Sequence, residues 1–207
     1  MEAGAGFPLD AARQPMTKKP ELAWQKKDLT EQTIRGEWVF RGKLLQVRRD
    51  LVRLPDGAST EREYIEHPGA VMIIPLLDSG ELVMERQYRY PLRRDILELP
   101  AGKIDPGEQP LDCAKRELLE ETGYAASNWR YVATTHPVVG YSDERIEIYL
   151  ARGLTHQGAN LDRDEHLEVF KLPLASALDW VREGRITDSK TVVGLFWVER
   201  ILRGEWT

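Results

Sequence analysis

The sequence predicts an α+β fold on three observations. Segments with strand patterning follow one another along much of the chain without a helix between each pair, which favours antiparallel pairing over strict βαβ alternation. The segments with helical patterning are few, and they lie between the later strands and after them. The chain has 207 residues, a length that suits one domain with a small additional segment.

The N-terminal part of the chain predicts an arm followed by a β-rich segment. Residues 1–32 mix Ala, Gly, Pro, Lys and Gln without a hydrophobic period, so we expect a flexible arm. In residues 33–66, short apolar runs are punctuated by glycines and by a Pro-Asp-Gly turn at 55–57, which predicts strands. We expect the main domain over residues 67–207.

The first strand of the main domain is predicted from an apolar run. Residues 70–77 are almost continuously apolar, which indicates a strand buried on both faces. A turn at 78–80 follows, and residues 82–90 predict a strand that returns from it. We therefore expect these two strands to form a central antiparallel hairpin.

Three helices are predicted in the second half of the chain. The clearest spans 110–122, because Pro110 suits the first turn of a helix and Gly123 suits its C-terminal cap. The remaining helices are expected at about 174–183 and 189–203, and strands at about 129–134, 146–151 and 167–171.

Composition and charge exclude several classes of protein. Lys and Arg number 29 against 34 Asp and Glu, a formal net charge of −5, so a surface for nucleic acid is not expected. No stretch approaches the about 18 apolar residues that a membrane span needs, and the N-terminus lacks a signal-peptide pattern. The single cysteine, Cys113, cannot form an intrachain disulfide and is expected to be a small packed residue. We expect a cytoplasmic protein without a membrane partner.

Acidic residues gather on the clearest helix. Glu117 and Glu121 are spaced i and i+4 with Glu120 beside them, so the three carboxylates crowd one side of the helix. Like charges at this spacing destabilise a helix, and the macrodipole disfavours them in its C-terminal half. Either this is a solvated acidic face, or it binds a hard cation such as Mg²⁺ or Mn²⁺ that offsets the repulsion. The backbone carbonyl of Ala101, in the preceding glycine-containing loop, can approach the same ion.

This segment resembles the Nudix box, whose pattern is Gly, five residues, Glu, seven residues, then Arg-Glu-apolar-any-Glu-Glu-any-Gly-apolar. The matching positions in this chain are Gly102, Glu108, Arg116, Glu117, Leu118, Glu120, Glu121, Gly123 and Tyr124. Seven fixed residue types in register would arise by chance about 10⁻⁸ times per starting position. Tyr124 departs from the aliphatic residue usual in the family, which bears on packing rather than on metal binding.

The resemblance implies a fold and a chemistry. The fold is an α-β-α sandwich with a mixed, largely antiparallel sheet, in which the box forms a loop, a helix and a loop. The chemistry is Mg²⁺-dependent hydrolysis of a diphosphate linked to another moiety, with Mn²⁺ as a substitute ion. Glu117 and Glu121 are implied as the main metal ligands, assisted by Glu120 and the Ala101 carbonyl. Arg116 either braces the box in a charge pair with Glu108, which we favour, or takes a direct part in catalysis.

Softer motifs extend the resemblance toward the ADP-ribose pyrophosphatase branch of this family. They lie at residues 62–71, 85–91, 97–102, 142–145 and 186–191. The branch implies a homodimer in which residues 33–66 exchange strands, so that the 62–63 pair reaches the adenine bound by the neighbouring subunit. Guanidinium groups bind phosphate oxygens in forked pairs, and carboxylates here would face the ribose or the bound metal. The substrate-binding residues implied are Arg62, Glu63, Arg86, Arg89, Glu98 and Glu144.

A general base is also required, because box carboxylates that hold metal are not free to accept a proton. The branch places a catalytic Glu in the loop before the strand at 167–171, where Glu165 is the candidate and Asp164 the alternative. Arg163 occupies a position where some members carry a second Glu, so the choice between the two stays open. The loop can also be read as ordinary solvated acids.

The leading interpretation is hydrolysis of ADP-ribose, or a similar nucleoside diphosphate sugar, to AMP and ribose 5-phosphate. GDP-mannose, a dinucleoside polyphosphate and a flavin or nicotinamide dinucleotide are alternative substrates, because Val139 stands where ADP-ribose hydrolases often carry Pro. A non-catalytic ADP-ribose sensor is an alternative from another class. The intact carboxylates at 117, 120 and 121 argue against that alternative.

Overall fold

The computed structural model of the protein describes residues 27–158 and 166–206. Most of the expected arm at residues 1–32 therefore lies outside the described residues, as do the candidate base Glu165 and its alternative Asp164. The described elements, in chain order, are β1 (Gln32–Arg41), β2 (Gln46–Arg53), β3 (Ser59–Ile65), β4 (Ala70–Pro75), β5 (Glu81–Arg89), the 3₁₀ helix η1 (Tyr90–Leu92), β6 (Arg94–Glu98), β7 (Ala101–Lys103), α1 (Pro110–Thr122), β8 (Tyr124–Thr135), β9 (Ile146–His156), β10 (Leu167–Pro173), α2 (Leu174–Arg182) and α3 (Ser189–Leu202).

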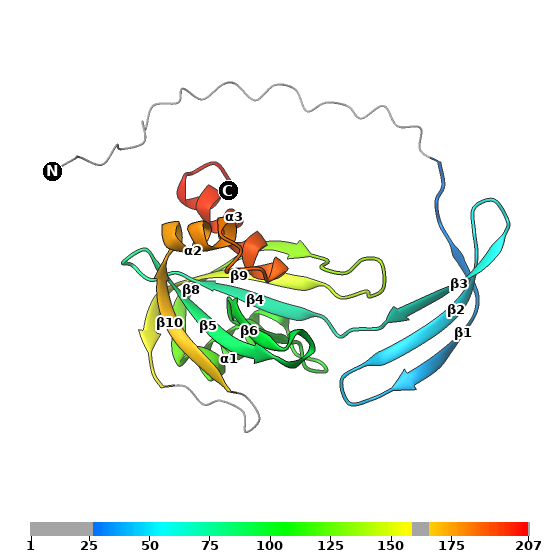
Figure 1. Ribbon diagram of the computed structural model, residues 1–207, viewed down its shortest axis with the longest axis horizontal. Helices are drawn as coiled ribbons and strands as arrows, with labels where there is room; N and C mark the ends of the chain where they lie inside the picture. The colour runs from blue at the N-terminus through cyan, green and yellow to red at the C-terminus, as the bar shows by residue number, and fades with distance from the viewer. Residues whose placement is uncertain (1–26, 159–165, 207) are drawn as a thin grey trace.

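The described strands form three sheets (Figure 1). The first contains β1, β2 and β3, and it projects away from the rest of the molecule at the right of Figure 1. The other two have the strand orders β7-β4-β9-β8 and β10-β5-β6. Strands β4 and β9 pair in parallel, whereas the strands beside them pair antiparallel. The predicted α+β class, with mixed and largely antiparallel sheets, is confirmed.

Helices cover both faces of the four-stranded sheet. Alternate residues of β4 point to opposite faces: Met72 and Ile74 pack on the side of α3 with Leu195, whereas Val71 and Ile73 pack on the side of α1. All five side chains are fully buried, and each such burial contributes about 1.5–3 kcal/mol. The apolar run that predicted a strand buried on both faces thus forms the middle layer of an α-β-α sandwich.

The predicted hairpin between β4 and β5 is wrong. A tight turn does join the two strands, since the Leu77 N–H donates to the Glu81 carbonyl at 2.9 Å, but only Leu76 and Leu82 pair, as an isolated bridge. Beyond the turn β4 lies between β7 and β9, and β5 lies between β10 and β6. The physical reason is that each strand has consecutive buried apolar residues, at 71–74 in β4 and 82–84 in β5, so each is covered on both faces as the central strand of a separate sheet.

Helix α1 has the predicted bounds. It ends at Gly123, whose φ of 72° is left-handed and whose N–H donates to the Leu119 carbonyl at 2.9 Å, a C-terminal cap that glycine adopts without strain. Cys113 is a free, buried thiol on this helix, and burial raises its pKa to about 12. Strand β8 begins at Tyr124, immediately after the cap, rather than near residue 129.

The N-terminal sheet exposes apolar side chains. Along β1, Ile34, Val39 and Phe40 are 44%, 46% and 55% exposed, and Leu44 and Leu45 are exposed in the turn that follows. Exposed apolar side chains that gather on one element are candidates for a protein contact.

Across the described ranges, no helix is both long enough and apolar enough to cross a membrane.

Candidate active site

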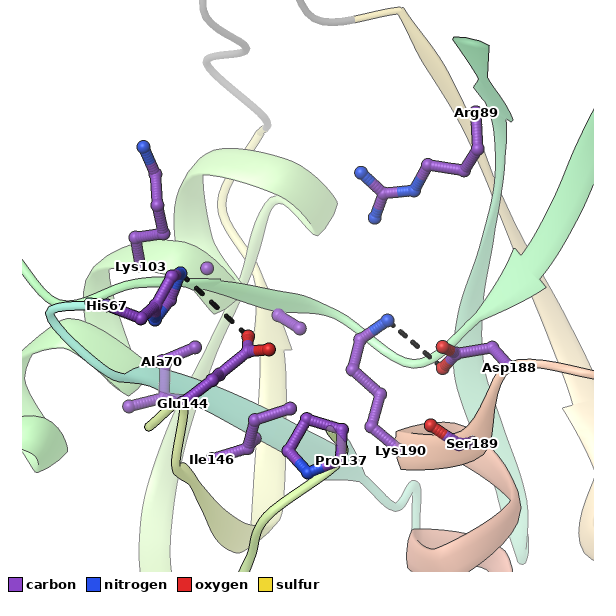
Figure 2. A pocket seen from close by; sticks show the side chains of 13 residues that line it. His67, Ala70, Arg89, Lys103, Pro137, Glu144, Ile146, Asp188, Ser189 and Lys190 are labelled. Carbon is purple, nitrogen blue, oxygen red and sulfur yellow. Dashed lines mark hydrogen bonds and ion pairs between the residues drawn. The ribbon is translucent and has the colours of Figure 1, made fainter. Parts of the chain in front are cut away.

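A cavity of about 310 Å³ opens where the box meets the start of α3 (Figure 2). Ala101 and Gly102 of β7 line it, and Arg89 reaches in from the end of β5. Glu144, in the loop before β9, lies on another side. The structure therefore brings together three residues that the sequence assigned to one site: Ala101, Arg89 and Glu144.

A second cavity, of about 650 Å³, adjoins the first. Both are lined by Arg89 and by residues 188–190, and the second is also lined by Tyr88, Tyr90 and Glu98. Small-molecule sites in proteins typically measure about 300–1,000 Å³. The two cavities together therefore offer room for an extended ligand that passes Arg89.

Arg116 links the loop of the box to its helix. Its Nε and one Nη donate to the two oxygens of Glu108, both at 2.9 Å, and its other Nη donates to Glu117 at 2.8 Å and Glu120 at 3.1 Å. The Asp105 N–H also donates to Glu108 at 3.0 Å. The bond from Arg116 lowers the pKa of Glu108 to about 2, so this carboxylate is ionised at neutral pH. This is the geometry that a bracing charge pair requires.

The metal-ligand candidates lie where the helix meets β7. A Cβ at position 102 would overlap the carboxyl group of Glu117, so that carboxylate occupies space that only glycine leaves open. Glu121 is 4% exposed and accepts the Ala101 N–H at 3.1 Å. Glu120 is more exposed and is held by Arg116.

These donors suit a hard divalent cation. Carboxylate and carbonyl oxygens are the ligands that such an ion prefers, and the cradle at Gly102 brings Glu117 against the β7 backbone. Within residues 27–158 and 166–206, no three His, Cys, Asp or Glu side chains converge on one point as a ready-made cluster. Arg116 holds two of the candidate carboxylates in this structure, so it neutralises charge that a metal ion would otherwise offset.

Glu98 lies at the centre of an ion-pair group between β5, β6 and α3. Arg89 donates to both of its oxygens, from Nε at 2.6 Å and from one Nη at 2.9 Å, and the Lys190 ammonium donates to it as well. Burial opposes ionisation of Glu98, but the cations outweigh it and its pKa is lowered. The pKa of Lys190 is raised, because the charges of Asp188 and Glu98 outweigh its burial.

Arg86 lies apart from Arg89 and has different partners. It pairs with Glu168 at 2.6 Å and with Asp95 at 3.2 Å on the surface of the β10-β5-β6 sheet, and it does not line either cavity. The two arginines are an odd number of positions apart on one strand, and side chains on a strand alternate between faces. Arg86 and Arg89 therefore lie on two different surfaces of this sheet.

Arg62 and Glu63 lie on β3 of the N-terminal sheet, away from the box. They line a hollow of about 330 Å³ together with Val139 and Tyr141. As neighbours on a strand they point to opposite faces, and Arg62 pairs with Glu31 at 2.7 Å.

Lys190 lies in the 186–191 motif, but it is not among the substrate-binding residues that the sequence implies. The signal for Lys190 in the sequence is its position in the first turn of a helix. A lysine there opposes the helix dipole and needs a compensating carboxylate. His67 also lines the first cavity. The Gly69 N–H donates to its Nδ1 at 3.1 Å, and its Nε2 lies 3.9 Å from Glu144.

The chain is similar to known proteins over most of its length. The family model described as "NUDIX domain" matches residues 66–191, and "Nucleoside diphosphate sugar hydrolase N-terminal domain" matches residues 31–65. The chain is 40% identical over 171 residues to a methanol dehydrogenase activator of Bacillus methanolicus, covering 82% of this chain and 92% of that protein. It is 38% identical over 175 residues to an ADP-ribose pyrophosphatase of Bacillus subtilis, covering 84% and 95%. A solved structure titled "Crystal structure of ADP compounds hydrolase" has a TM-score of 0.77 and 28% identity, covering 86% of this chain and 98% of that one.

Proposed function

The chain belongs to the Nudix family, and on that premise we propose that it hydrolyses the diphosphate bond of ADP-ribose, or of a closely similar nucleoside diphosphate sugar, to give AMP and ribose 5-phosphate. One observation carries the proposal. The cavity beside the box is lined by Ala101 and Gly102, against which Glu121 and Glu117 lie, and by the guanidinium of Arg89. Oxygens suited to a metal ion and a cation suited to phosphate therefore lie around one space, which supports diphosphate hydrolysis.

Nudix hydrolases need a divalent metal ion, and we propose Mg²⁺, with Mn²⁺ as a substitute. Glu117, Glu121 and the Ala101 carbonyl would hold it, with Glu120 assisting. When bound, such an ion neutralises charge on the diphosphate oxygens and activates water.

The chain's own residues orient the substrate and accept the proton. Arg89 would bind the diphosphate oxygens from the side opposite the box, and Glu144 would face the ribose or the ion. Glu165, with Asp164 as the alternative, would accept a proton from water. The position of β10 supports this role, because Leu167 at its start pairs with Gln87, two residues before Arg89 on β5.

We also propose that the protein is a homodimer assembled through residues 33–66, with residues 67–207 forming the hydrolase domain of a cytoplasmic enzyme. The exposed apolar side chains of β1 support such a contact. Arg62 and Glu63 lie away from the box cavity of their own chain, so their proposed role is at the adenine bound by the neighbouring subunit.

A substrate panel tests the proposed function. The purified protein is incubated with Mg²⁺ and ADP-ribose, GDP-mannose, diadenosine polyphosphates, flavin dinucleotide or reduced nicotinamide dinucleotide, and the products are identified. Fastest turnover of ADP-ribose to AMP and ribose 5-phosphate supports the proposal. Faster turnover of another compound would replace the substrate, and tight binding of ADP-ribose without any product would favour a sensor.

A further inference from the structure

The two cavities meet at a small group of charged side chains: Arg89, Glu98, Asp188 and Lys190. Glu98 is the shared carboxylate, with its side chain only 3% exposed. Of its two cationic partners, Arg89 is 41% exposed and Lys190 is 12% exposed. Arg89 is therefore the more accessible of the two cations, although Lys190 also lines both cavities.

Arg89 uses one edge of its guanidinium for Glu98. Nε and one Nη donate to the two carboxylate oxygens in a forked pair. A planar guanidinium has a second edge with further N–H groups, and Figure 2 shows the group pointing into the cavity. Glu98 therefore sets the direction in which Arg89 presents its second edge to a ligand.

Glu98 can orient Arg89 only while its own carboxylate stays ionised and fixed. Taking a carboxylate out of water is costly unless close partners compensate it. Lys190 is the less exposed partner of Glu98, and it approaches from α3 rather than from the strand that carries Arg89.

Lys190 is itself held in place by the start of α3. Its ammonium donates to Asp188 at 3.0 Å, and the Asp188 carboxylate also accepts the Thr191 N–H at 3.0 Å as the N-terminal cap of the helix. The Thr191 hydroxyl accepts the Leu99 N–H at 2.9 Å, which ties the helix to the residue that follows Glu98. The motif at 186–191 thus fixes the position of the Lys190 ammonium group.

We propose that Lys190 is a positioning residue for substrate binding, because it fixes Glu98 and Glu98 turns the second edge of Arg89 toward the diphosphate. This role rests on the proposed function, in which Arg89 binds the diphosphate. Although Lys190 lines both cavities, its ammonium is paired with Glu98 and Asp188, so its proposed effect on the substrate passes through Arg89. Its loss therefore weakens substrate binding and leaves the chemical step intact.

A double-mutant cycle on the full-length protein tests this role. Lys190→Met, Arg89→Gln and the double variant are compared with the wild type for hydrolysis of ADP-ribose with Mg²⁺. We expect Lys190→Met to raise KM about tenfold, with kcat within about twofold. In the Arg89→Gln background the same change is expected to raise KM less than about twofold, because the residue it positions is gone. Lys171→Met, on the surface of β10, serves as the matched control.

Thermal unfolding of each variant is measured beside the kinetics. If Lys190→Met does not fold, Lys190→Gln replaces it in the same cycle. Effects on KM that multiply in the double variant would show that Lys190 acts independently of Arg89 and would overturn the proposal, as would an unchanged KM in a folded Lys190 variant. Absence of ADP-ribose hydrolysis by the wild type would overturn the proposed function and this role with it.

Discussion

The carboxyl group of Glu117 lies against Gly102, in the space that a side chain at position 102 would fill. Glu117 is on α1 and Gly102 is on β7, so this contact brings the helix of the box against its loop. This contact holds the Glu117 carboxylate beside the cavity that Gly102 lines.

Gly102→Ala is expected to displace Glu117 and lower kcat. Gly102 is not among the glycines with positive φ, so the backbone tolerates alanine and the effect comes from the carboxylate alone. We expect kcat for ADP-ribose to fall by about 10²-fold and the Mg²⁺ concentration for half-maximal rate to rise. Gly140→Ala, where a Cβ would meet nothing within 4 Å, is the control. Wild-type kinetics in Gly102→Ala would refute the role of Glu117.

Glu108 is expected to stabilise the fold more at neutral pH than at acid pH. Arg116 lowers its pKa from 4.5 to about 2. Because the folded-state pKa is below the unfolded one, this stabilisation is present above about pH 4.5 and is lost as pH falls toward 2. Glu108→Gln should therefore lower the free energy of unfolding in urea by more at pH 7 than at pH 3. The surface variant Glu183→Gln should show no such difference, and an equal effect of Glu108→Gln at both pH values would contradict the ion pair.

Glu165→Gln tests the base in the loop before β10. A positioned general base contributes about 10²–10⁴-fold to the rate, so we expect kcat to fall by at least about 10²-fold with KM little changed. Asp164→Asn is measured in parallel and is expected to keep most of the activity. The reverse pattern would move the role to Asp164.

Phe40→Asp tests the dimer contact on β1. Placing a charge on this exposed apolar strand is expected to break the contact between chains. Light scattering should then report the single-chain mass of 23.8 kDa for the variant and twice that mass for the wild type. Ser79→Asp, in the turn after β4, is expected to remain dimeric. A wild type at the single-chain mass would rule out the dimer.

Local sequence patterns predicted much of the fold and the helix that carries the box carboxylates. Pro110 and Gly123 set the bounds of α1 because capping depends on residues within the helix ends. The family implied by the box is confirmed, since the box positions lie close together in sequence. The spacing of the carboxylates also placed them on one helix.

Pairings between distant segments could not be predicted in the same way. The apolar run at 70–77 showed that β4 is buried on both faces, but not that β9 would lie beside it in parallel. Lys190 meets Glu98 from a position 92 residues away, and no local pattern specifies that contact. The arginines in residues 86–94 appear as one cluster in the sequence until strand alternation separates Arg86 from Arg89.

The rate of AMP formation from ADP-ribose with Mg²⁺, in the wild type and in Glu121→Gln, tests the proposed chemistry most directly. Glu121→Gln keeps an oxygen that can accept the Ala101 N–H but removes the charge that a metal ion needs, and it also relieves repulsion among neighbouring carboxylates. We expect AMP formation to be abolished in this variant while its melting temperature is unchanged or higher. Near wild-type AMP formation by a folded Glu121→Gln would show that the box carboxylates do not carry the reaction.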